Sequence, residues 1–262
     1  MGYDVVEPDI MRWAATVGRT AINLNWNLDG FTTPLVFPPG EGWRYGTSID
    51  WVGQLIEKLS GVSLGAYLQQ HIFGPLGMRD TGFWPAKLPA TGGRAVFAHR
   101  NPDTGELHAG PAPHPDEHDV ESGGAGLYST ANDYARFVSG LLGGRLLAAE
   151  TVGRLFQPRL DERQRTALDA AVGQMHDMYK PEFPPELPVS FSYAGMVNLE
   201  DSPGKRRKGS VMWSGMVNGH WWIDLEAGIA GILVTTVLPP GDSEVKALYH
   251  ELETAVYAGL AG

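Results

Sequence analysis

The strongest constraint on the fold lies in the last third of the chain, where the spacing of apolar residues changes from that of helices to that of strands. From residue 191 the sequence predicts four β-strands, at 191–199, 210–216, 220–224 and 228–238. The connections at 217–219 and 225–227 are short enough for hairpin turns, so we expect antiparallel strands. Segment 243–260 has apolar residues at helical spacing and predicts a helix that covers one face of the sheet.

The preceding residues predict mostly helical structure interrupted by long loops. Helices are expected at 8–17, 48–60, 64–73, 130–142 and 148–156. Residues 84–126 are rich in proline and glycine and lack periodicity, apart from short strands near 94–99, which is typical of loops that carry binding function. We therefore predict a mostly helical region at 1–190 and, at 191–262, the antiparallel strands and C-terminal helix of an α/β region of the α+β type.

A Pro/Gly turn at 38–48 brings Tyr45 to the start of the predicted 48–60 helix. Proline ends any earlier helix, and Thr47 or Ser48 serves as the N-cap. A tyrosine held on a rigid loop at a helix N-terminus can carry a proton, provided that nearby positive charge lowers its pKa from about 10. The alternative is a tyrosine that only packs against the helix.

Three phrases of the sequence occur in a characteristic order. The first is YGT at 45–47 with PLGMRDTGF at 75–83, the second is GGAGLYSTANDY at 123–134, and the third is WSG at 213–215 with WWID at 221–224. Together they resemble the class C beta-lactamase and penicillin-binding-protein-like serine hydrolase superfamily, in its family VIII esterase or transesterase branch. The resemblance covers nearly the whole chain and implies a beta-lactamase/transpeptidase-like fold.

The nucleophile of that superfamily is the serine of a helical Ser-x-x-Lys motif. The sequence contains this pattern only at Ser202-Pro203-Gly204-Lys205, where proline and glycine predict a turn. We therefore expect the N-terminal part of a full-length relative, with the nucleophile, to be absent.

The resemblance implies an acyl-enzyme mechanism on an ester or amide carbonyl. Tyr45 takes the place of the family's tyrosine, which works with the motif lysine as general base, and Thr47 stands where the family usually has asparagine. The backbone N–H of Met216 corresponds to the strand half of the oxyanion hole. We expect Tyr45 to share one cleft with residues 213–216.

The strand phrase also bears on the substrate. Trp213-Ser214-Gly215 stands where beta-lactamases have Lys-Thr-Gly, and the loss of that lysine favours neutral esters over penicillin-like acids. The candidate substrate-binding residues are Thr47, Trp213, Ser214, Gly215, His220 and Trp221. Because side chains alternate along a strand, at most one of Trp221 and Trp222 faces a substrate.

Two further patterns have a structural explanation. Ser63 lies in a Gly-x-Ser-x-Gly pattern, but the preceding segment is predicted to be helical, whereas a nucleophile elbow follows a strand. We therefore predict that Ser63 caps a helix. His114 and His118 match His-x-x-Glu-His, but the prolines at 111, 113 and 115 oppose the helix that a zinc site needs, so a polar surface loop is predicted.

Composition limits the remaining classes. The chain has 262 residues and a net charge of −10, which opposes general nucleic-acid binding; residues 205–208 form a basic run that we expect to be a solvated loop, the alternative being a docking patch for an acidic group. The absence of cysteine excludes disulfides and thiol catalysis. No membrane span or signal peptide is visible, which favours a cytoplasmic location, and no cofactor or metal is expected.

These features lead to one main hypothesis and two alternatives. The main hypothesis is a carboxylesterase-like serine hydrolase of the beta-lactamase family, present as a C-terminal fragment that is inactive or weakly active alone. Its partners are a small ester or amide substrate and an N-terminal complementing polypeptide or a second copy. The alternatives are a non-catalytic binding module, and a beta-lactamase or DD-peptidase.

Overall fold

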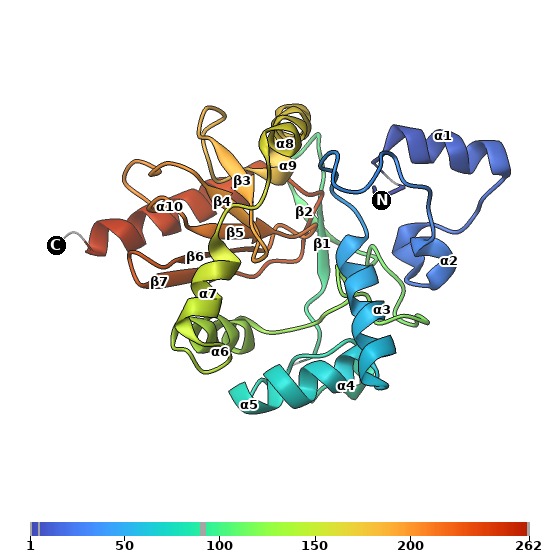
Figure 1. Cartoon of the computed structure of the whole chain (residues 1–262), viewed down its shortest axis with the longest axis horizontal. Coiled ribbons are helices and arrows are strands. Elements are labelled where there is room, and N and C mark those ends of the chain that lie inside the picture. Colours follow the sequence, from blue (N-terminus) through green and yellow to red (C-terminus); the bar gives the residue numbers. More distant parts are fainter. Residues whose placement is uncertain (1, 5, 90–92, 261–262) are drawn as a thin grey trace. The chain divides into compact units, whose positions relative to one another are not determined.

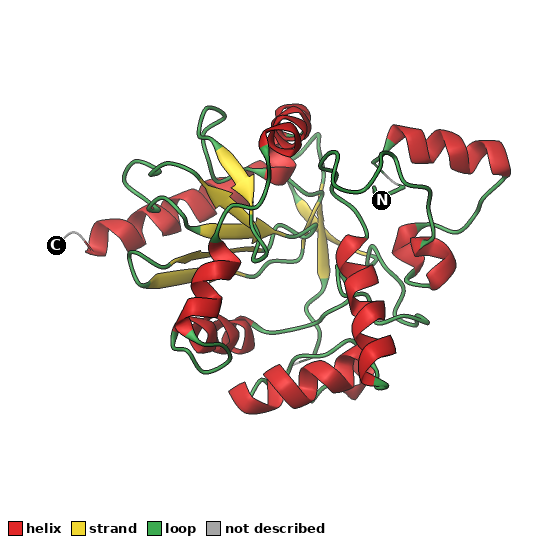
Figure 2. Cartoon of the chain, in the orientation of Figure 1, coloured by secondary structure: helices red, strands yellow, loops and turns green. Residues whose placement is uncertain are grey.

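The chain passes back and forth between two structural units in the computed structural model, which describes residues 2–4, 6–89 and 93–260 (Figures 1 and 2). The first unit comprises Met1–Arg94 and Ala112–Asp133, and the second comprises Ala95–Pro111 and Tyr134–Gly262. The boundary predicted at residue 190 therefore differs from the boundaries of the two compact units. The reason is that helices between 134 and 190 pack against the strands that follow them.

The first unit is helical, as the periodicity predicts. Its elements are α1 (Pro8–Val17), η1 (Asn23–Asn25), α2 (Leu28–Phe31), α3 (Ser48–Ser60), α4 (Leu64–Leu68), η2 (Gln69–Phe73), α5 (Gly74–Leu76) and η3 (Pro85–Lys87). The bounds predicted for α1 and α3 are confirmed, because local signals set them: proline begins α1, and Gly18 and Gly61 end the two helices with left-handed backbone angles (φ 64° and 74°).

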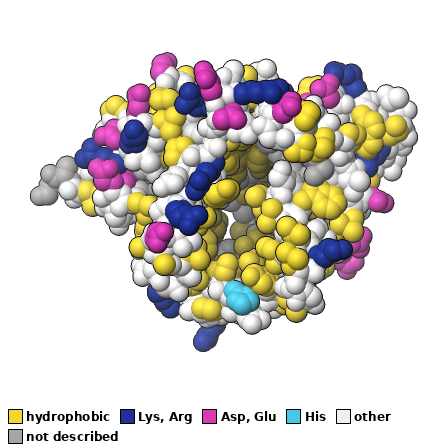
Figure 3. All heavy atoms as spheres, in the orientation of Figure 1, with side chains coloured by type: hydrophobic (Ala, Val, Ile, Leu, Met, Phe, Trp, Pro, Cys, Tyr) yellow, Lys and Arg dark blue, Asp and Glu magenta, His cyan; other side chains and the backbone are white. Residues whose placement is uncertain are grey.

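An apolar stripe of α3 faces solvent rather than the core. The core of this unit contains Trp26, Phe31 and Val120, with Trp51 of α3 packed against it. On the same helix Ile49, Val52, Leu55 and Leu59 are 57%, 48%, 53% and 78% exposed. Figure 3 shows many exposed hydrophobic side chains on the face that carries α3 in Figure 1. A row of exposed apolar side chains of this kind is a candidate interaction surface.

The second unit contains the strands and the remaining helices. These are β1 (Phe97–Arg100), β2 (Leu107–Gly110), α6 (Ala131–Leu142), α7 (Ala149–Phe156), α8 (Glu162–Gln174), α9 (His176–Tyr179), β3 (Val189–Phe191), β4 (Met196–Asn198), β5 (Val211–Ser214), β6 (His220–Asp224), β7 (Ile229–Leu233), β8 (Val237–Leu238) and α10 (Ser243–Leu260). In the described part of the chain, no helix combines the length and apolar character that a membrane crossing demands.

A five-stranded sheet in the order β3-β4-β5-β6-β7 forms the centre of this unit, and every neighbouring pair is antiparallel. The antiparallel prediction is thus confirmed for these strands. The predicted strands at 191–199 and 228–238 are each divided in two, and β8 instead pairs in parallel with β1 in a second sheet, β2-β1-β8. Local periodicity cannot reveal such a partner, because Ala98 and Val237 are far apart in the sequence.

Helices cover both faces of the five-stranded sheet. On one face Val197, Val211 and Ile223 pack with the apolar sides of α6 and α7. On the other face His220 and Trp222 contact Tyr249 of α10 at ring-centroid distances of 4.5 and 5.7 Å. The prediction that the C-terminal helix covers one face is confirmed, with its bounds unchanged.

The basic run at 205–208 is not a solvated loop, so that prediction is wrong for its first half. Arg206 is fully buried, where its Nε donates to Glu253 Oε1 at 2.5 Å and its Nη2 donates to Tyr249 Oη at 2.8 Å. Lys205 Nζ donates to Glu253 Oε2 at 3.1 Å. The charges can be buried because one carboxylate of α10 pairs with both of them. This partner lies 47 residues away from Arg206.

Removing the carboxylate of Glu253 should cost far more stability than removing an exposed one from the same helix. Glu253→Ala leaves Arg206 and Lys205 buried without the carboxylate that bonds to both, which costs about 3–5 kcal/mol. Glu251→Ala changes an exposed residue and should stay within about 0.5 kcal/mol. Urea unfolding measures both variants, and equal losses would contradict this account. The double variant Arg206→Met/Glu253→Leu should recover the part of the loss that Arg206 causes, while Lys205 still lacks Glu253.

Candidate active site

Tyr45 lies in the turn before α3 and is half-buried. Its ring meets the ring of Tyr3 edge to face, with a centroid distance of 5.0 Å. Burial raises the pKa of Tyr3 far above its ordinary value, and the neighbouring Tyr45 and Asp50 raise it further. Tyr3 therefore remains a neutral phenol beside Tyr45.

Asp50 connects the start of α3 by hydrogen bonds to the loop that begins the second sequence phrase at 123–134. Its carboxylate is 1% exposed and accepts hydrogen bonds from the Ser122 hydroxyl and, at 3.1 Å, from the Gly124 N–H. Burial raises the pKa of Asp50. Thr47, at the N-cap position, is also buried, and its hydroxyl has no hydrogen-bond partner in the described chain, so it does not cap the helix through its side chain.

The two glycines of that phrase allow this close approach. A Cβ at position 123 would lie 2.8 Å from the carbonyl oxygen of Ile49, and one at position 124 would lie 2.7 Å from Oδ2 of Asp50. Both distances are shorter than ordinary carbon–oxygen contacts. The Gly123-Gly124 pair therefore lets this loop pack directly on the helix that follows Tyr45.

In the second unit, the third phrase lies at the end of β5, the central strand of its sheet. Trp213 contacts the rings of Tyr179 and Phe191, at centroid distances of 6.4 and 5.3 Å, and Ser214 donates a long hydrogen bond to the Met178 carbonyl. Gly215 and Met216 follow in the exposed turn that leads to β6. Aromatic rings thus surround Trp213 just before an exposed backbone turn.

Trp221 and Trp222 point to opposite faces of β6, as alternation predicts. Trp221 lies opposite Trp213 and packs beside Tyr134, whose pKa burial raises to about 12. Trp222 is buried against α10. Of the pair, Trp221 is therefore the one that shares a face with Trp213.

His220 lies in a closed environment on the α10 face. It is 3% exposed, and its Nδ1 lies 2.6 Å from Oε1 of Glu182. Its ring stacks on Tyr249. This placement supports the position of the β5–β6 hairpin and gives His220 no open surface of its own.

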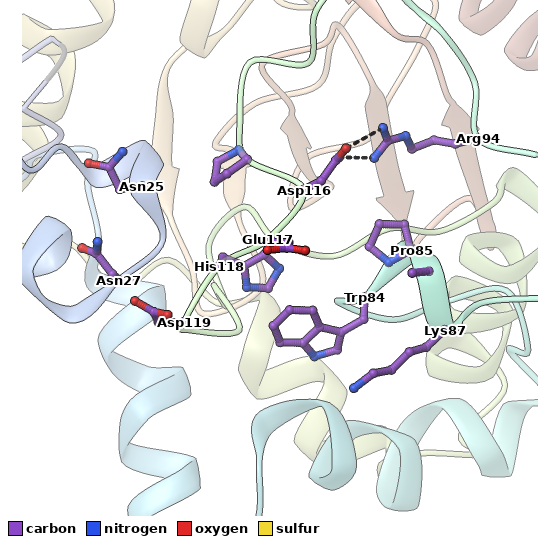
Figure 4. Close-up of a pocket in the computed structure, with 12 residues that line it drawn as sticks. Asn25, Asn27, Trp84, Pro85, Lys87, Arg94, Asp116, Glu117, His118 and Asp119 are labelled. Carbon is purple, nitrogen blue, oxygen red and sulfur yellow. Dashed lines mark hydrogen bonds and ion pairs between the residues drawn. The ribbon is translucent and has the colours of Figure 1, made fainter.

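A polar cavity of about 970 Å³ lies in the first unit, within the loops expected to carry binding function (Figure 4). Trp84 lies between His118, stacked at 4.1 Å, and Lys87, whose Nζ is 5.1 Å from the ring centroid. Asp116 forms a two-point ion pair with Arg94, and both side chains line the cavity. The sequence indicated a loop here, but the cavity depends on contacts between residues distant in the chain.

The remaining motifs have structural roles. Ser63 accepts a hydrogen bond from Ala66 N–H at 3.2 Å, which confirms it as a helix cap. Ser202 and Lys205 lie in a turn, as predicted. His114 stacks on Trp26, and residues 114–118 form no helix. In the described residues, no group of three or more histidine or carboxylate side chains is placed to hold a metal ion.

Comparison with known proteins identifies the class. A profile of the Beta-lactamase family matches residues 29–256, and the chain belongs to this family. It is 35% identical over 235 residues to a monacolin J acid methylbutanoyltransferase of Aspergillus terreus, covering 86% of this chain and 56% of that protein. It is 29% identical over 255 residues to a lovastatin esterase of Penicillium rubens, covering 94% of this chain and 63% of that protein.

A solved structure also matches over the whole chain. A LovD6 mutant of simvastatin synthase from Aspergillus terreus superposes with a TM-score of 0.90 and 33% identity, covering 100% of this chain and 63% of the other. The beta-lactamase/transpeptidase-like α/β fold is therefore established. The chain spans less than two thirds of the length of these relatives.

Sequence reasoning missed Tyr3 and Asp50. Asp50 falls on the helix that follows Tyr45, at a position where an acidic first-turn residue is common, so it gave no special signal. Its partner Ser122 lies 72 residues away. Only the two adjacent glycines of the second phrase indicated that a close backbone approach occurs there.

Replacing Asp50 by asparagine should change the pH dependence of stability. Since folding raises the pKa of Asp50, the protonated acid is stabilised at low pH, and this contribution is lost as pH rises through the folded-state pKa. Below the ordinary carboxyl pKa of about 4, the free energy of unfolding of the wild type is highest relative to that of Asp50→Asn. As pH rises, stability should shift in favour of the variant and then level off.

Urea unfolding midpoints from pH 4 to pH 8 measure this difference. Asp29→Asn, which changes an exposed carboxylate of the same unit, is the control and should show little pH-dependent change. A stability difference between Asp50→Asn and wild type that does not vary with pH would contradict a raised pKa.

Proposed function

We propose that this chain supplies the Tyr motif and the oxyanion strand of a serine hydrolase or acyltransferase that acts on neutral esters of small molecules. The observation that carries the proposal is the pairing of family membership with a Trp-Ser-Gly strand followed by an exposed turn. The names of the relatives, a methylbutanoyltransferase and a lovastatin esterase, support an acyl ester as the substrate class.

In the proposed reaction a serine hydroxyl adds to the ester carbonyl, its proton passes to the base, and the alcohol leaves with a proton. Water or an acceptor alcohol then cleaves the acyl-enzyme. Tyr45 moves the proton, with Thr47 beside it. Tyr3 holds the ring of Tyr45 by an edge-to-face contact and, being neutral, adds no competing charge.

The backbone N–H of Met216 serves as one oxyanion donor. Met216 is 38% exposed, and within the described part of the chain its N–H donates to no acceptor. A donor left free in the folded protein is available to a developing negative charge. Trp213 and Trp221 form an apolar surface on one face of the two strands that this turn connects. Ser214 and Gly215 lie between Trp213 and Met216.

We infer that the nucleophile comes from a polypeptide outside these 262 residues. Within them Ser-x-x-Lys occurs only in the turn at 202–205, where Lys205 is already paired. Both units also present apolar surface that a further segment can cover. In the first unit it is the α3 stripe, and in the second it is the exposed stripe of α10 formed by Leu248, Leu252, Val256 and Leu260.

The α10 stripe lies close to β7, which pairs with β6 on one side only. A cavity of about 230 Å³ between α10 and β7 is lined by residues that include Leu252, Val256 and Gly231. β7 is an edge strand of the five-stranded sheet. An edge strand beside an apolar helix face favours a complementing polypeptide that adds a strand; a second copy of the chain is the alternative occupant.

Of the two alternative functions, one has some support and the other does not. A non-catalytic binding module is favoured by the lack of a helical Ser-x-x-Lys in this sequence and by the polar cavity around Trp84. A beta-lactamase or DD-peptidase is disfavoured because Trp213 stands where a lysine holds the substrate carboxylate.

Ester turnover tests the proposal directly. With 4-nitrophenyl butyrate, a protein that turns over should lose about 10²–10⁴-fold in kcat on Tyr45→Phe, because the phenol that moves the proton is gone. Ser63→Ala is the control and should not change kcat. No turnover by the wild-type chain under any condition, including complementation, favours the binding module. Turnover that depends on Ser63 and not on Tyr45 contradicts the assignment.

Complementation tests the source of the nucleophile. The unmatched part of the Aspergillus terreus transferase, in which the resemblance places Ser-x-x-Lys, is produced separately and mixed with this chain. Esterase activity should rise, since a lost nucleophile costs on the order of 10⁶-fold in rate in a serine hydrolase. A segment carrying Ser→Ala in its motif should restore nothing.

Charge placed on α10 shows whether this surface is used. Leu252→Lys, at an exposed apolar position, should abolish association in size-exclusion chromatography, while Glu244→Lys on the same helix should not. Association that both variants retain places the complementing segment elsewhere. Self-association of the chain alone, lost in Leu252→Lys, favours the second copy.

A further inference from the structure

The turn that carries Met216 contains a buried asparagine in a left-handed conformation. Asn218 is 2% exposed and has φ 56°, one of two positive values at non-glycine residues in the described chain. The turn itself is closed by two backbone bonds, from Gly215 N–H to Gly219 O at 2.8 Å and from Asn218 N–H to Gly215 O at 2.9 Å. With a glycine on either side, these bonds alone leave the turn considerable freedom.

The side chain of Asn218 makes four hydrogen bonds to the backbone of one other segment. Its Nδ2 donates to the carbonyl oxygens of Val237 and Pro239, at 2.9 and 2.8 Å. Its Oδ1 accepts from the N–H groups of Gly241 and Asp242, at 2.8 and 3.0 Å. The side chain thus uses both amide hydrogens and both oxygen lone pairs, which is its full capacity.

The segment at 237–242, to which the Asn218 side chain is hydrogen-bonded, is itself held by other contacts. Asp242 caps α10 by accepting from Val245 N–H at 3.0 Å, and its other contacts include a two-point ion pair with Arg100 of β1. Asn218 therefore connects the turn to the junction of a helix start and a second sheet. A second, weaker link comes from the Thr235 hydroxyl, which donates to the Val217 carbonyl.

We propose that Asn218 is the positioning residue of the oxyanion hole, holding the Met216 N–H in a fixed place. Met216 lies two residues from Asn218 and has no hydrogen bond of its own in the described chain to fix it. A donor stabilises a developing oxyanion best when it does not have to reorganise, and misplacement by about 1 Å costs up to 10²-fold. This inference rests on the proposed role of Met216.

A matched pair of substitutions separates positioning from general stability. Asn218→Asp keeps the size and the left-handed backbone but loses both donors to Val237 and Pro239. Asn198→Asp is the control, because Asn198 is also buried and its Nδ2 donates to two backbone carbonyls, those of Glu200 and Arg207, at 2.8 and 2.9 Å. Each variant loses two hydrogen bonds from a side-chain amide to backbone carbonyls. We expect only Asn218→Asp to loosen the turn at 215–219.

The first measurement is the backbone amide of Met216 in ¹⁵N-labelled protein, titrated with sodium butyrate, whose carboxylate stands in for an oxyanion. The wild-type signal should shift with added butyrate. Asn218→Asp should weaken this binding at least about tenfold and speed amide exchange at 215–219, while Asn198→Asp should change both less than threefold. In a protein that turns over, Asn218→Asp should lower kcat by up to about 10²-fold with little change in KM.

The outcomes distinguish a failure of the role inferred for Asn218 from a failure of the role proposed for Met216. A wild-type Met216 amide that does not respond to butyrate removes Met216 as an oxyanion donor, and the inference with it. A wild-type response that Asn218→Asp leaves intact overturns the inference alone. Equal effects of Asn218→Asp and Asn198→Asp also overturn it, because the role of Asn218 is then only structural. Asn218→Gly, which keeps the backbone angle, should reproduce the loosening seen with Asn218→Asp.

Discussion

The register between β5 and β6 is the constraint on which the second unit depends. Trp213 lies opposite Trp221, and Met212 lies opposite Trp222. A slip of one residue would exchange the faces of every side chain on the strand. The aromatic surface around Trp213 and the core beneath α10 therefore follow from a single pairing, and the turn that carries Met216 has its length fixed by the same pairing.

The buried charges beneath α10 hold this helix on the sheet. Burying them costs solvation free energy, which the groups around them offset. The Arg206 guanidinium lies 4.9, 5.4 and 5.9 Å from the ring centroids of Phe183, Trp222 and Tyr249, besides its bond to Glu253. Aromatic faces and a carboxylate replace the water that the ion loses. One buried cation thereby orients the helix on the sheet, which apolar contacts alone define less sharply.

The sequence predicted what local signals control and missed what distant residues control. The bounds of α1, α3 and α10 follow from periodicity, proline and glycine, and the hairpin between β5 and β6 from its length. The burial of Arg206, the pairing of β1 with β8, and the contact of Asp50 with Ser122 depend on partners many residues away. The sequence indicated Asn218 only as a turn residue. The four backbone groups that its side chain bonds lie at 237–242, and the sequence of the turn does not reveal that segment as a partner.

In the proposed function, tryptophan at position 213 both disfavours penicillin-like acids and favours neutral esters. With tryptophan at position 213, the strand lacks the cation that holds a substrate carboxylate, and Tyr179 and Phe191 extend the apolar surface instead. A neutral ester loses little solvation on such a surface, whereas a carboxylate loses much. Beside an apolar wall, the proposed hydrogen bond from Met216 N–H to a developing oxyanion would be electrostatically stronger than in water. The proposed discrimination against acids and the stabilisation of the transition state would then have one physical cause.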